Sequence, residues 1–430
     1  MKKILLLALL IAHLAYGQKY PNVMLGKSPA SPIGLCEPSI TINPQDPANL
    51  VAGVILDQVF YSQDSGKTWT RDTLFSPYGV WGDPVVVSDT AGAHYYFHLS
   101  DPTGENWAGE RILDRIVCQK STDGGRTWSE GTHLGLNHPK DQDKEWAAVD
   151  PQNNNLYVAW TQFDDYGSKN PEDRSQIKVA YSQDGAASWS AAQTINQYSG
   201  NCLDGDSTTE GAVPSVGPNG EVYVAWALGE RIFFDRSLDS GRTWLDQDRV
   251  VAAHEGGWEI AIEGLQRCNG MPVTAVDRSK GPHRGRVYVN WVDKRRGNYD
   301  VWLAYSDDQG DSWSDPVRVN DDQGRADQFL TWLDVDPATG HLYTVFYDRR
   351  GRRGTQTDVY LAYSRDGGQH WTNERISEKP FKPEASVFFG DYNHIDVQGG
   401  LIRPIWTRYE QDSLSVWTAL IQERMLPMEE

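Results

Sequence analysis

The stretch SLDSGRTW at residues 237–244 decides the fold, because its pattern Ser-x-Asp-x-Gly-x-Thr-Trp returns at intervals along the chain. Two other stretches match all five fixed positions, and three more match with one or two substitutions. These five copies occupy residues 62–69, 121–128, 182–189, 306–313 and 364–371. The aspartates of successive copies lie 55 to 69 residues apart, which is long enough for four short strands and their loops. A repeat of that length predicts one propeller blade per copy.

The residue types of the motif suit a turn between two strands. The Asp side chain can accept backbone N–H groups within the turn, and glycine can adopt the positive φ that a tight turn requires. The tryptophan can cover the apolar face of the hairpin. The motif is therefore expected to build the fold rather than to carry chemistry.

Short β-prone runs before the motifs supply the other strands of each blade. Runs such as LYVAW at residues 156–160 and VYVAW at residues 222–226 are bounded by turn residues, as strands are. First, second and third strands can be counted seven times, whereas the last unit, residues 391–421, ends after its third strand. We expect residues 20–26 to supply the missing outer strand, so that both chain ends close the ring in one blade. The sequence therefore predicts an all-β, seven-bladed β-propeller, with six blades and a C-terminal extension as the alternative.

Composition and charge exclude several classes of protein. The chain has 430 residues, 39% hydrophobic residues and a formal net charge of −19. A field of that sign argues against nucleic acid or an anionic membrane as a partner. With 40 glycines, 17 tryptophans and 20 tyrosines, the composition suits many short strands joined by tight turns better than a helical bundle.

The first residues have the form of an export signal. Two lysines precede an apolar run over residues 4–15, and a small-x-small cleavage site follows at residues 15–17. We expect a cleaved Sec signal peptide at residues 1–17 and a single propeller domain at residues 18–430. The protein is thus predicted to be secreted or periplasmic, to be a monomer, and not to be inserted in a membrane after cleavage.

Export would permit disulfides among the four cysteines, Cys36, Cys118, Cys202 and Cys268. Three full pairings are open, and the sequence does not choose between them. No Cys-x-x-Cys motif occurs, so the cysteines indicate neither a zinc site nor a redox site.

The six copies of the motif resemble the Asp-box, also called the BNR repeat, of the sialidase superfamily. The resemblance covers nearly all of the chain after the leader and implies a β-propeller. In family sialidases three arginines hold the substrate carboxylate, a tyrosine paired with a glutamate is the nucleophile, and an aspartate is the acid/base. Here Tyr392, in the stretch GDYN at residues 390–393, resembles the region that carries the nucleophile. The family's first arginine precedes the first box, whereas no arginine precedes Arg71 in this chain.

The loops that lead into the first strand of each blade are acidic. In a propeller these inlet loops lie on the face opposite the Asp-box turns, around the central channel. Their carboxylates are Glu37, Asp83, Asp143, Glu145, Glu210, Asp327 and Asp391. We expect either solvated carboxylates, or a cation site such as Ca²⁺ on Glu37 and Asp391, or an acid/base pair in which mutual repulsion raises one pKa. The predicted chemistry requires no cofactor.

The loops after the second strands open on the same face and carry arginines that could hold a carboxylate, sulfate or phosphate of a substrate. The candidates are Arg295, Arg349 and Arg408. The alternative is that aspartates in the same loops pair with the arginines and order those loops. Trp81 is a candidate for stacking on a sugar ring.

Together these features favour a secreted protein that acts on an extracellular glycan, as a sialidase-like glycoside hydrolase of the exo-α-sialidase type. In that hypothesis Tyr392 is the nucleophile, Glu210 its base and Asp83 the acid/base. The three arginines form the substrate clamp, and Glu145 and Trp81 contact the sugar. Two alternatives stay open, because a shared fold does not fix function. One is a noncatalytic propeller that binds glycan or protein. The other is a polysaccharide lyase, which uses a His or Tyr base beside an arginine to take a proton next to a uronate carboxylate.

Overall fold

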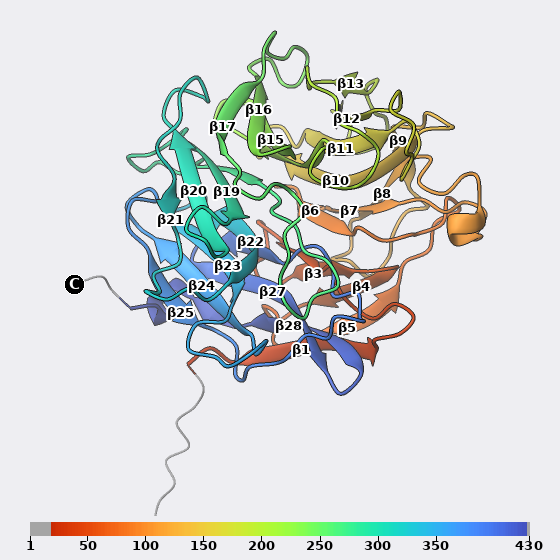
Figure 1. Cartoon of the computed structure of the whole chain (residues 1–430). Coiled ribbons are helices and arrows are strands. Elements are labelled where there is room, and N and C mark those ends of the chain that lie inside the picture. Colours follow the sequence, from red (N-terminus) through yellow and green to blue (C-terminus); the bar gives the residue numbers. More distant parts are fainter. Residues whose placement is uncertain (1–18, 428–430) are drawn as a thin grey trace, which may run out of the picture.

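The computed structural model describes residues 19–427 as seven antiparallel sheets arranged around one axis (Figure 1). The prediction of an all-β, seven-bladed propeller is confirmed. The leader predicted at residues 1–17 lies outside the described residues. Within the described part, the helices are two short 3₁₀ turns, η1 (Asn106–Ala108) and η2 (Glu423–Met425). No helix among residues 19–427 is long and apolar enough to span a membrane.

The first three blades have four strands each, and the first strand of each blade lines the channel. Blade 1 contains β2 (Ser39–Ile42), β3 (Leu50–Val54), β4 (Gln58–Ser62) and β5 (Thr70–Thr73). Blade 2 contains β6 (Val85–Ser88), β7 (His94–Leu99), β8 (Ile116–Ser121) and β9 (Thr132–Leu134). Blade 3 contains β10 (Asp141–Val149), β11 (Leu156–Phe163), β12 (Ser175–Ser182) and β13 (Gln193–Thr194).

The next three blades repeat this order. Blade 4 contains β14 (Glu210–Val216), β15 (Val222–Leu228), β16 (Arg231–Ser237) and β17 (Arg249–Ala253). Blade 5 contains β18 (Val273–Val276), β19 (Val287–Asp293), β20 (Asp300–Ser306) and β21 (Val317–Arg318). Blade 6 contains β22 (Gln328–Val335), β23 (Leu342–Asp348), β24 (Asp358–Ser364) and β25 (Thr372–Arg375).

Blade 7 joins the two ends of the described chain. Its strands are β26 (His394–Gln398), β27 (Leu401–Glu410), β28 (Ser413–Ala419) and β1 (Asn22–Pro29), with β29 (Ile421–Gln422) also pairing with β27. The pairing of β1 with β28 runs from Asn22 opposite Ala419 to Pro29 opposite Ser413. The N-terminal segment therefore closes the ring as predicted, with the strand extending three residues beyond the expected end at residue 26.

The Asp-box turns connect the third and fourth strands of the first six blades. In the copy at residues 237–244, the Asp239 carboxylate accepts bonds from the Thr243 N–H and the Thr243 hydroxyl, both at 2.8 Å. The Gly241 N–H donates to the Ser237 hydroxyl at 2.8 Å, and Gly241 has a φ of 81°. The motif thus has the structural role expected of it. We call the end of the ring that carries these turns the turn face, and the opposite end the inlet face.

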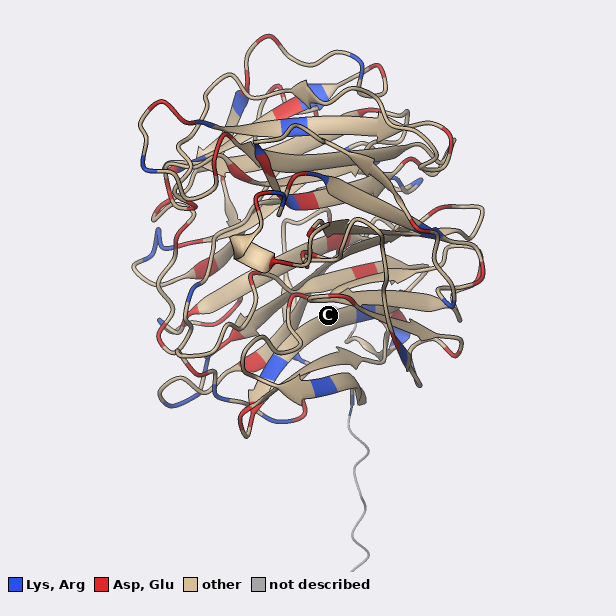
Figure 2. Cartoon of the chain, turned by 90° about the vertical axis from the view of Figure 1, so that its right-hand side faces the viewer, with Lys and Arg blue, Asp and Glu red and all other residues tan. Residues whose placement is uncertain are grey.

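Large aromatic residues fill the space between neighbouring blades. Trp160, Trp226, Trp291 and Trp406 lie on the second strands of blades 3, 4, 5 and 7, and each is at most 1% exposed. Charged residues lie mainly in the loops and at strand ends, whereas the strands between them are largely uncharged (Figure 2). The apolar core therefore holds the strands in place, and the loops are free to carry polar chemistry.

The four cysteines do not form the disulfides that export would permit. Cys36, Cys118, Cys202 and Cys268 are all buried as free thiols. Burial raises the pKa of each thiol, with that of Cys268 above the range in which a thiolate forms near neutral pH. These residues therefore act as small apolar side chains of the core.

Candidate active site at the centre of the inlet face

A left-handed backbone position repeats where the chain enters the inner strands. As a reference in each blade we take the residue at which the inner strand begins its uninterrupted pairing with the second strand. In five blades, the residue two positions before this reference has a φ between 47° and 72°. These residues are Glu37, Asp83, Lys144, Gly211 and Leu330. By the same alignment Tyr392 holds this position in blade 7. Positive φ is uncommon outside glycine, and strained backbone of this kind clusters at functional sites.

Lys144 lies among four carboxylates at the centre of the inlet face. Its Nζ is 3.4 Å from Asp143 Oδ2, 3.6 Å from Asp204 Oδ1, 3.9 Å from Glu210 Oε2 and 4.0 Å from Asp391 Oδ2. Burial alone lowers the pKa of an ammonium, but these carboxylates raise the Lys144 pKa well above its ordinary value. The side chain is therefore a charged link between the inlet loops of blades 3, 4 and 7.

Arg267 supplies a second cation, from the loop between blades 4 and 5. Its guanidinium binds the Asp391 carboxylate through Nε, at 2.9 Å, and through Nη2, and its Nη1 lies 3.6 Å from Asp204. Beside it, Asn269 Nδ2 donates to the Asp391 backbone oxygen at 2.9 Å, and the Asp391 N–H donates to Glu37 Oε1 at 3.1 Å. The Arg267 side chain is 45% exposed, so it forms the outer wall of the cluster.

Tyr392 lies in this cluster, and its hydroxyl makes no hydrogen bond to the described residues. The residue is 6% exposed, and among the described residues its Oη has no hydrogen-bond partner. Burial raises its pKa well above the ordinary value, and the nearby charges of Asp83, Glu37 and Glu145 raise it further. A buried hydroxyl without a partner costs on the order of 1 to 3 kcal/mol of stability, so its retention requires an explanation.

Four carboxyl groups of the cluster favour their neutral form. They are Glu37, Asp83, Glu145 and Glu210, and burial is the main cause of the raised pKa of each. The pKa of Asp83 rises to about 7, because burial and then repulsion from Asp143 oppose its ionisation. Among residues 19–427, neither side-chain oxygen of Glu145 or of Glu210 has a hydrogen-bond partner. A cluster of proton donors beside two cations suits acid/base catalysis.

The cluster borders a small cavity that opens on the inlet face. The cavity measures about 90 Å³ where Arg267 and Asp204 line it, and an adjoining inner part is lined by Tyr392, Asp83 and Glu145. Ordinary ligand pockets begin at about 300 Å³. A sugar ring therefore fits only after a wall residue moves, and the half-exposed Arg267 is the residue placed to do so.

An aromatic wall stands next to the cavity. Trp107 is 60% exposed, stacks on Tyr166 with ring centroids 5.6 Å apart and meets Trp81 edge-on at 6.0 Å. The Tyr166 hydroxyl donates to Asp204 Oδ2, which ties this wall to the charged cluster. Trp81, predicted to stack on a sugar, is thus joined to the site through Trp107.

The structure brings most of the predicted site residues to one place. The predicted residues in the cluster are Tyr392, Asp83, Glu210, Glu145, Glu37 and Asp391. Glu210 lies against Lys144, whereas the glutamates whose charge acts on Tyr392 are Glu37 and Glu145. The role of Glu210 as the base for Tyr392 stays a prediction, and Glu37 and Glu145 are further candidates for it.

The three predicted clamp arginines are held apart, Arg295 and Arg349 in loops of blades 5 and 6 and Arg408 on strand β27 of blade 7. Arg295 Nε donates to Asp293 Oδ1 at 2.9 Å, Arg349 Nη2 to the Glu263 backbone oxygen at 2.7 Å, and Arg408 Nη2 to Glu410 Oε2 at 3.2 Å. These contacts do not support a clamp made of Arg295, Arg349 and Arg408. For two of them, the contacts favour the alternative in which acidic neighbours order their own loops. The arginine on the cavity is Arg267.

Sequence reasoning missed Lys144, Arg267 and Asp204. Lys144 stands between two of the predicted carboxylates, in the stretch DKEW at residues 143–146, and its place in that acidic run is a signal that could have found it. Arg267 and Asp204 lie in the inlet loops of blades 5 and 4, which, like that of blade 7, are longer than the inlet loops of the other blades. Nothing in the repeat pattern singles them out.

The predicted cation site on Glu37 and Asp391 has limited room for a metal. The two residues are in contact, but the Asp391 carboxylate is bound by Arg267. Over residues 19–427, no group of three or more His, Cys, Asp or Glu side chains is arranged to hold a metal ion. The calcium hypothesis stays a prediction without a supporting ligand set.

Comparison with solved structures finds other propellers. The ulvan lyase of polysaccharide lyase family PL25 matches with a TM-score of 0.54 and 11% identity, over 94% of this chain and 96% of that one. The Hadza microbial sialidase Hz136 matches with a TM-score of 0.50 and 15% identity, over 89% of this chain and 76% of that one. At these identities the likeness concerns the fold alone.

Sequence comparison gives a curated relative and a family. The sialidase of Bacteroides fragilis (strain YCH46) is 23% identical over 312 residues, which cover 66% of this chain and 52% of that protein. This chain thus spans about half the length of the curated relative. The family model for the BNR repeat-like domain matches residues 154–388, more than half of the chain. This protein is therefore a member of the BNR repeat-like domain family.

Proposed function

We propose that this protein acts on glycans as a sialidase-like glycoside hydrolase, with the inlet-face cluster as its catalytic centre. The observation that carries the proposal is the buried Tyr392 hydroxyl, which has no hydrogen-bond partner among the described residues, on a cavity that Asp83 and Glu145 also line. The similarity to a sialidase of Bacteroides fragilis supports the same class of reaction. A hydroxyl kept without a partner in such a site is available to a substrate.

In this proposal Tyr392 is the nucleophile. Its Oη forms a bond to the anomeric carbon as the glycosidic C–O bond breaks, and its proton passes to Glu37 or Glu145, one of which has to be ionised in the reacting form although burial favours the neutral acid. Asp83, with a pKa of about 7, gives its proton to the leaving oxygen. Asp83 then takes a proton from water as the water oxygen attacks the anomeric carbon and releases Tyr392, which regains its own proton.

Arg267 and Lys144 are the cations placed to hold an anionic sugar. The sialosides that a sialidase acts on carry a carboxylate, and a guanidinium can bind that group through two parallel hydrogen bonds. Arg267 is exposed enough to release Asp391 and to bind such a ligand instead. The movement of the Arg267 side chain would also enlarge the small cavity. Lys144 is more deeply placed and keeps the carboxylates of three loops together.

A uronate lyase is the second candidate, and one feature of the site favours it. Tyr392 lies in one cluster with Lys144 and Arg267, and a lyase needs a base beside a cation that neutralises a uronate carboxylate. Tyr392, ionised after giving its own proton to a carboxylate of the cluster, would then take the proton next to the uronate carboxylate as the bond to the leaving oxygen breaks, and Asp83 would protonate that oxygen. The product would carry a new C=C bond, whereas hydrolysis leaves none.

Turnover of defined substrates tests these proposals. The secreted protein is incubated with an aryl sialoside, neutral aryl glycosides and uronate polymers, with release of the aryl group, reducing ends and ultraviolet absorbance of unsaturated products followed separately. We expect aryl release from the sialoside. Unsaturated products would identify a lyase, and binding of glycan without any turnover would identify a noncatalytic propeller.

Matched tyrosine variants test the role of the hydroxyl. Tyr392→Phe is expected to lower kcat/KM by about 10³-fold, because the nucleophile is lost. Tyr288→Phe is the control, since Tyr288 on β19 is also buried with an unpartnered hydroxyl among the described residues. That control is expected to stay within about twofold of the parent. Equal loss in both variants would overturn the assignment.

The predicted export, an extracellular glycan as partner and a monomeric state are also proposals. The charged and apolar stretch at residues 1–17 motivates the proposal of export. N-terminal sequencing of the mature protein should give Gln18 as the first residue, and light scattering should give the mass of one chain.

A further inference from the structure

The channel of the propeller is divided by an aromatic plug. The Trp146 ring lies 4.0 Å from that of Trp332 and stacks on His394 at 5.6 Å with the planes 10° apart. Tyr392 meets Trp146 edge-on at 5.0 Å from the inlet side. Trp146 borders the catalytic cavity and also a second cavity that opens toward the turn face. The two cavities therefore share one wall and are separate spaces.

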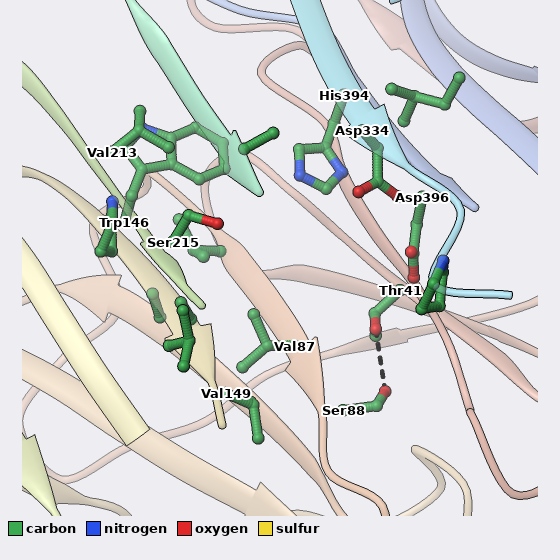
Figure 3. A pocket seen from close by; sticks show the side chains of 18 of the residues that line it. Thr41, Val87, Ser88, Trp146, Val149, Val213, Ser215, Asp334, His394 and Asp396 are labelled. Atoms are coloured by element: carbon green, nitrogen blue, oxygen red, sulfur yellow. Dashed lines mark hydrogen bonds between the residues drawn. The ribbon is translucent and has the colours of Figure 1, made fainter. Parts of the chain in front are cut away.

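The second cavity has the size of a small-molecule site. It measures about 350 Å³ and is lined by residues of the first strands of all seven blades, mostly Val, Ala, Ile and Pro. Val87, Val149 and Val213 belong to this lining (Figure 3). Such a volume lies within the range of about 300 to 1,000 Å³ of known ligand pockets, which are mainly apolar with a few placed polar groups.

Two carboxyl groups lie together on one side of this cavity, whereas Thr41, Ser88 and Ser215 are polar residues at other points of its lining. Asp334 and Asp396 come from the neighbouring strands β22 and β26, and Figure 3 shows their carboxylates beside each other on the cavity wall. Asp334 Oδ2 accepts the Val397 N–H at 2.7 Å, and Asp396 Oδ2 accepts the Ile42 N–H. These bonds to the next blade fix both carboxylates in place.

The charged and titratable groups on this side of the cavity are few. Arg278, at the end of β18, lowers the pKa of Asp334, and the His394 ring borders the same wall. Burial and mutual repulsion nevertheless raise the pKa of Asp334 well above its ordinary value, while burial raises that of Asp396. Two carboxyl groups this close together oppose each other's ionisation.

We infer that this cavity is a second ligand site, separate from the catalytic centre, which binds a small molecule with an apolar body and one cationic amine. The apolar body lies against the valines and the Trp146–Trp332 floor, where a ring or alkyl chain replaces water. The ammonium donates to Asp334 and Asp396, and its positive charge offsets the repulsion between the two carboxylates. An anionic head group would meet the same two carboxylates and is disfavoured.

Three probes of equal shape test the charge preference. Benzylamine, benzyl alcohol and benzoate share one ring and differ in the head group. Binding to the full-length secreted protein is measured by saturation-transfer NMR titration at neutral pH. We expect benzylamine to bind about tenfold more tightly than benzyl alcohol and benzoate to show no binding. Equal Kd values for the amine and the alcohol, or no binding of the amine, would overturn the inference.

Variants locate the bound amine. Asp396→Asn keeps an oxygen for the Ile42 N–H and is expected to weaken benzylamine binding about tenfold. Ser215→Phe fills the cavity, since Ser215 lines it, and is expected to abolish binding (Figure 3). Tyr392→Phe, on the other side of the plug, is expected to leave benzylamine binding unchanged, so failure of the glycosidase proposal does not affect this test. Melting curves confirm that each variant is folded, and unchanged binding in folded Ser215→Phe would place the amine elsewhere.

Discussion

The carboxylates of the turn face and of the inlet face behave in opposite ways. In the turn at residues 121–128, Asp123 accepts bonds from the Thr127 N–H at 2.9 Å, the Thr127 hydroxyl at 2.6 Å and the Ser121 hydroxyl at 2.9 Å. Those donors outweigh the opposing effect of burial and lower the Asp123 pKa to about 2. On the inlet face, Glu145 has no partner among the described residues, and burial raises its pKa well above the ordinary value.

The difference shows what distinguishes a structural carboxylate from a reactive one in this fold. Each Asp-box brings its own hydrogen-bond donors within four residues, so its carboxylate is satisfied and ionised. On the inlet face Glu145 and Glu210 lack such donors, which leaves them as proton donors and binding groups, whereas Asp204 and Asp391 are held by Tyr166 and Arg267. Sites that break the ordinary rules of polar satisfaction are where function is expected.

Removing the cation from the inlet face is expected to have the largest effect. Lys144→Met leaves Asp143, Asp204 and Asp391 without their shared ammonium, and loss of one partner from a buried charge network costs about 3 to 5 kcal/mol. The free energy of unfolding from urea titration at pH 7 measures this loss. Lys67→Met, on an exposed position of a turn-face motif, is the control and is expected to change stability by less than about 0.5 kcal/mol. Equal losses of stability in Lys144→Met and Lys67→Met would contradict the difference between the two faces.

A glycine of a turn-face motif tests how strongly the local geometry of that turn determines stability. Gly310 has a φ of 93°, and an added Cβ would lie 2.1 Å from the Phe234 ring. Gly310→Ala is expected to cost about 3 kcal/mol, through strain at positive φ and overpacking. The copy at residues 182–189 carries Ala186 at the same position with a φ of 67°. Ala186→Gly is therefore the matched control, expected to change the urea midpoint little, since relief of strain and loss of a buried methyl offset each other.

The turn face could be predicted from sequence because its interactions are local. Asp239 and Thr243 are four residues apart, so one short stretch contains both the acceptor and its donors. Six repetitions of that stretch also give the spacing of the blades. The closure of the ring by the N-terminal strand followed from the seventh blade's missing strand, because an open edge is unfavourable.

The inlet face could be predicted only in part. The repeat register identified Asp83, Glu145 and Tyr392, since each precedes an inner strand. Arg267 lies 124 residues from its partner Asp391, and no local pattern encodes such a pairing. Arg295 was a plausible clamp by residue type, but an aspartate two residues before it already binds its guanidinium.

The pH dependence of stability in an Asp83 variant tests whether the folded inlet face favours the protonated form of this carboxyl group. Its folded pKa of about 7 lies above the unfolded value near 4, so the folded state binds the proton more tightly. Its contribution to stability is full at pH 4 and is lost as the pH rises through about 7. Asp83→Asn mimics the neutral acid, and we expect it to be as stable as the parent at pH 4 and more stable by on the order of 2 kcal/mol at pH 8. Urea titrations at the two pH values check this, and a variant less stable at both would contradict it.

Asp123 is the opposite case and has the smallest expected effect. Its pKa of about 2 lies below the unfolded value, so the ionised form stabilises the fold, and that contribution is lost as the pH falls from about 4 to 2. Asp123→Asn weakens the acceptor for Thr127, and because the side chain is partly exposed to solvent we expect a loss of only about 1 kcal/mol at pH 7 and almost none at pH 2. Asp315→Asn, at an exposed position outside the motif's conserved residues, serves as the control. If Asp123→Asn instead gained stability at pH 7, as Asp83→Asn is expected to do at pH 8, the carboxylates of the two faces would not differ in kind, and the argument from hydrogen-bond donors would fail.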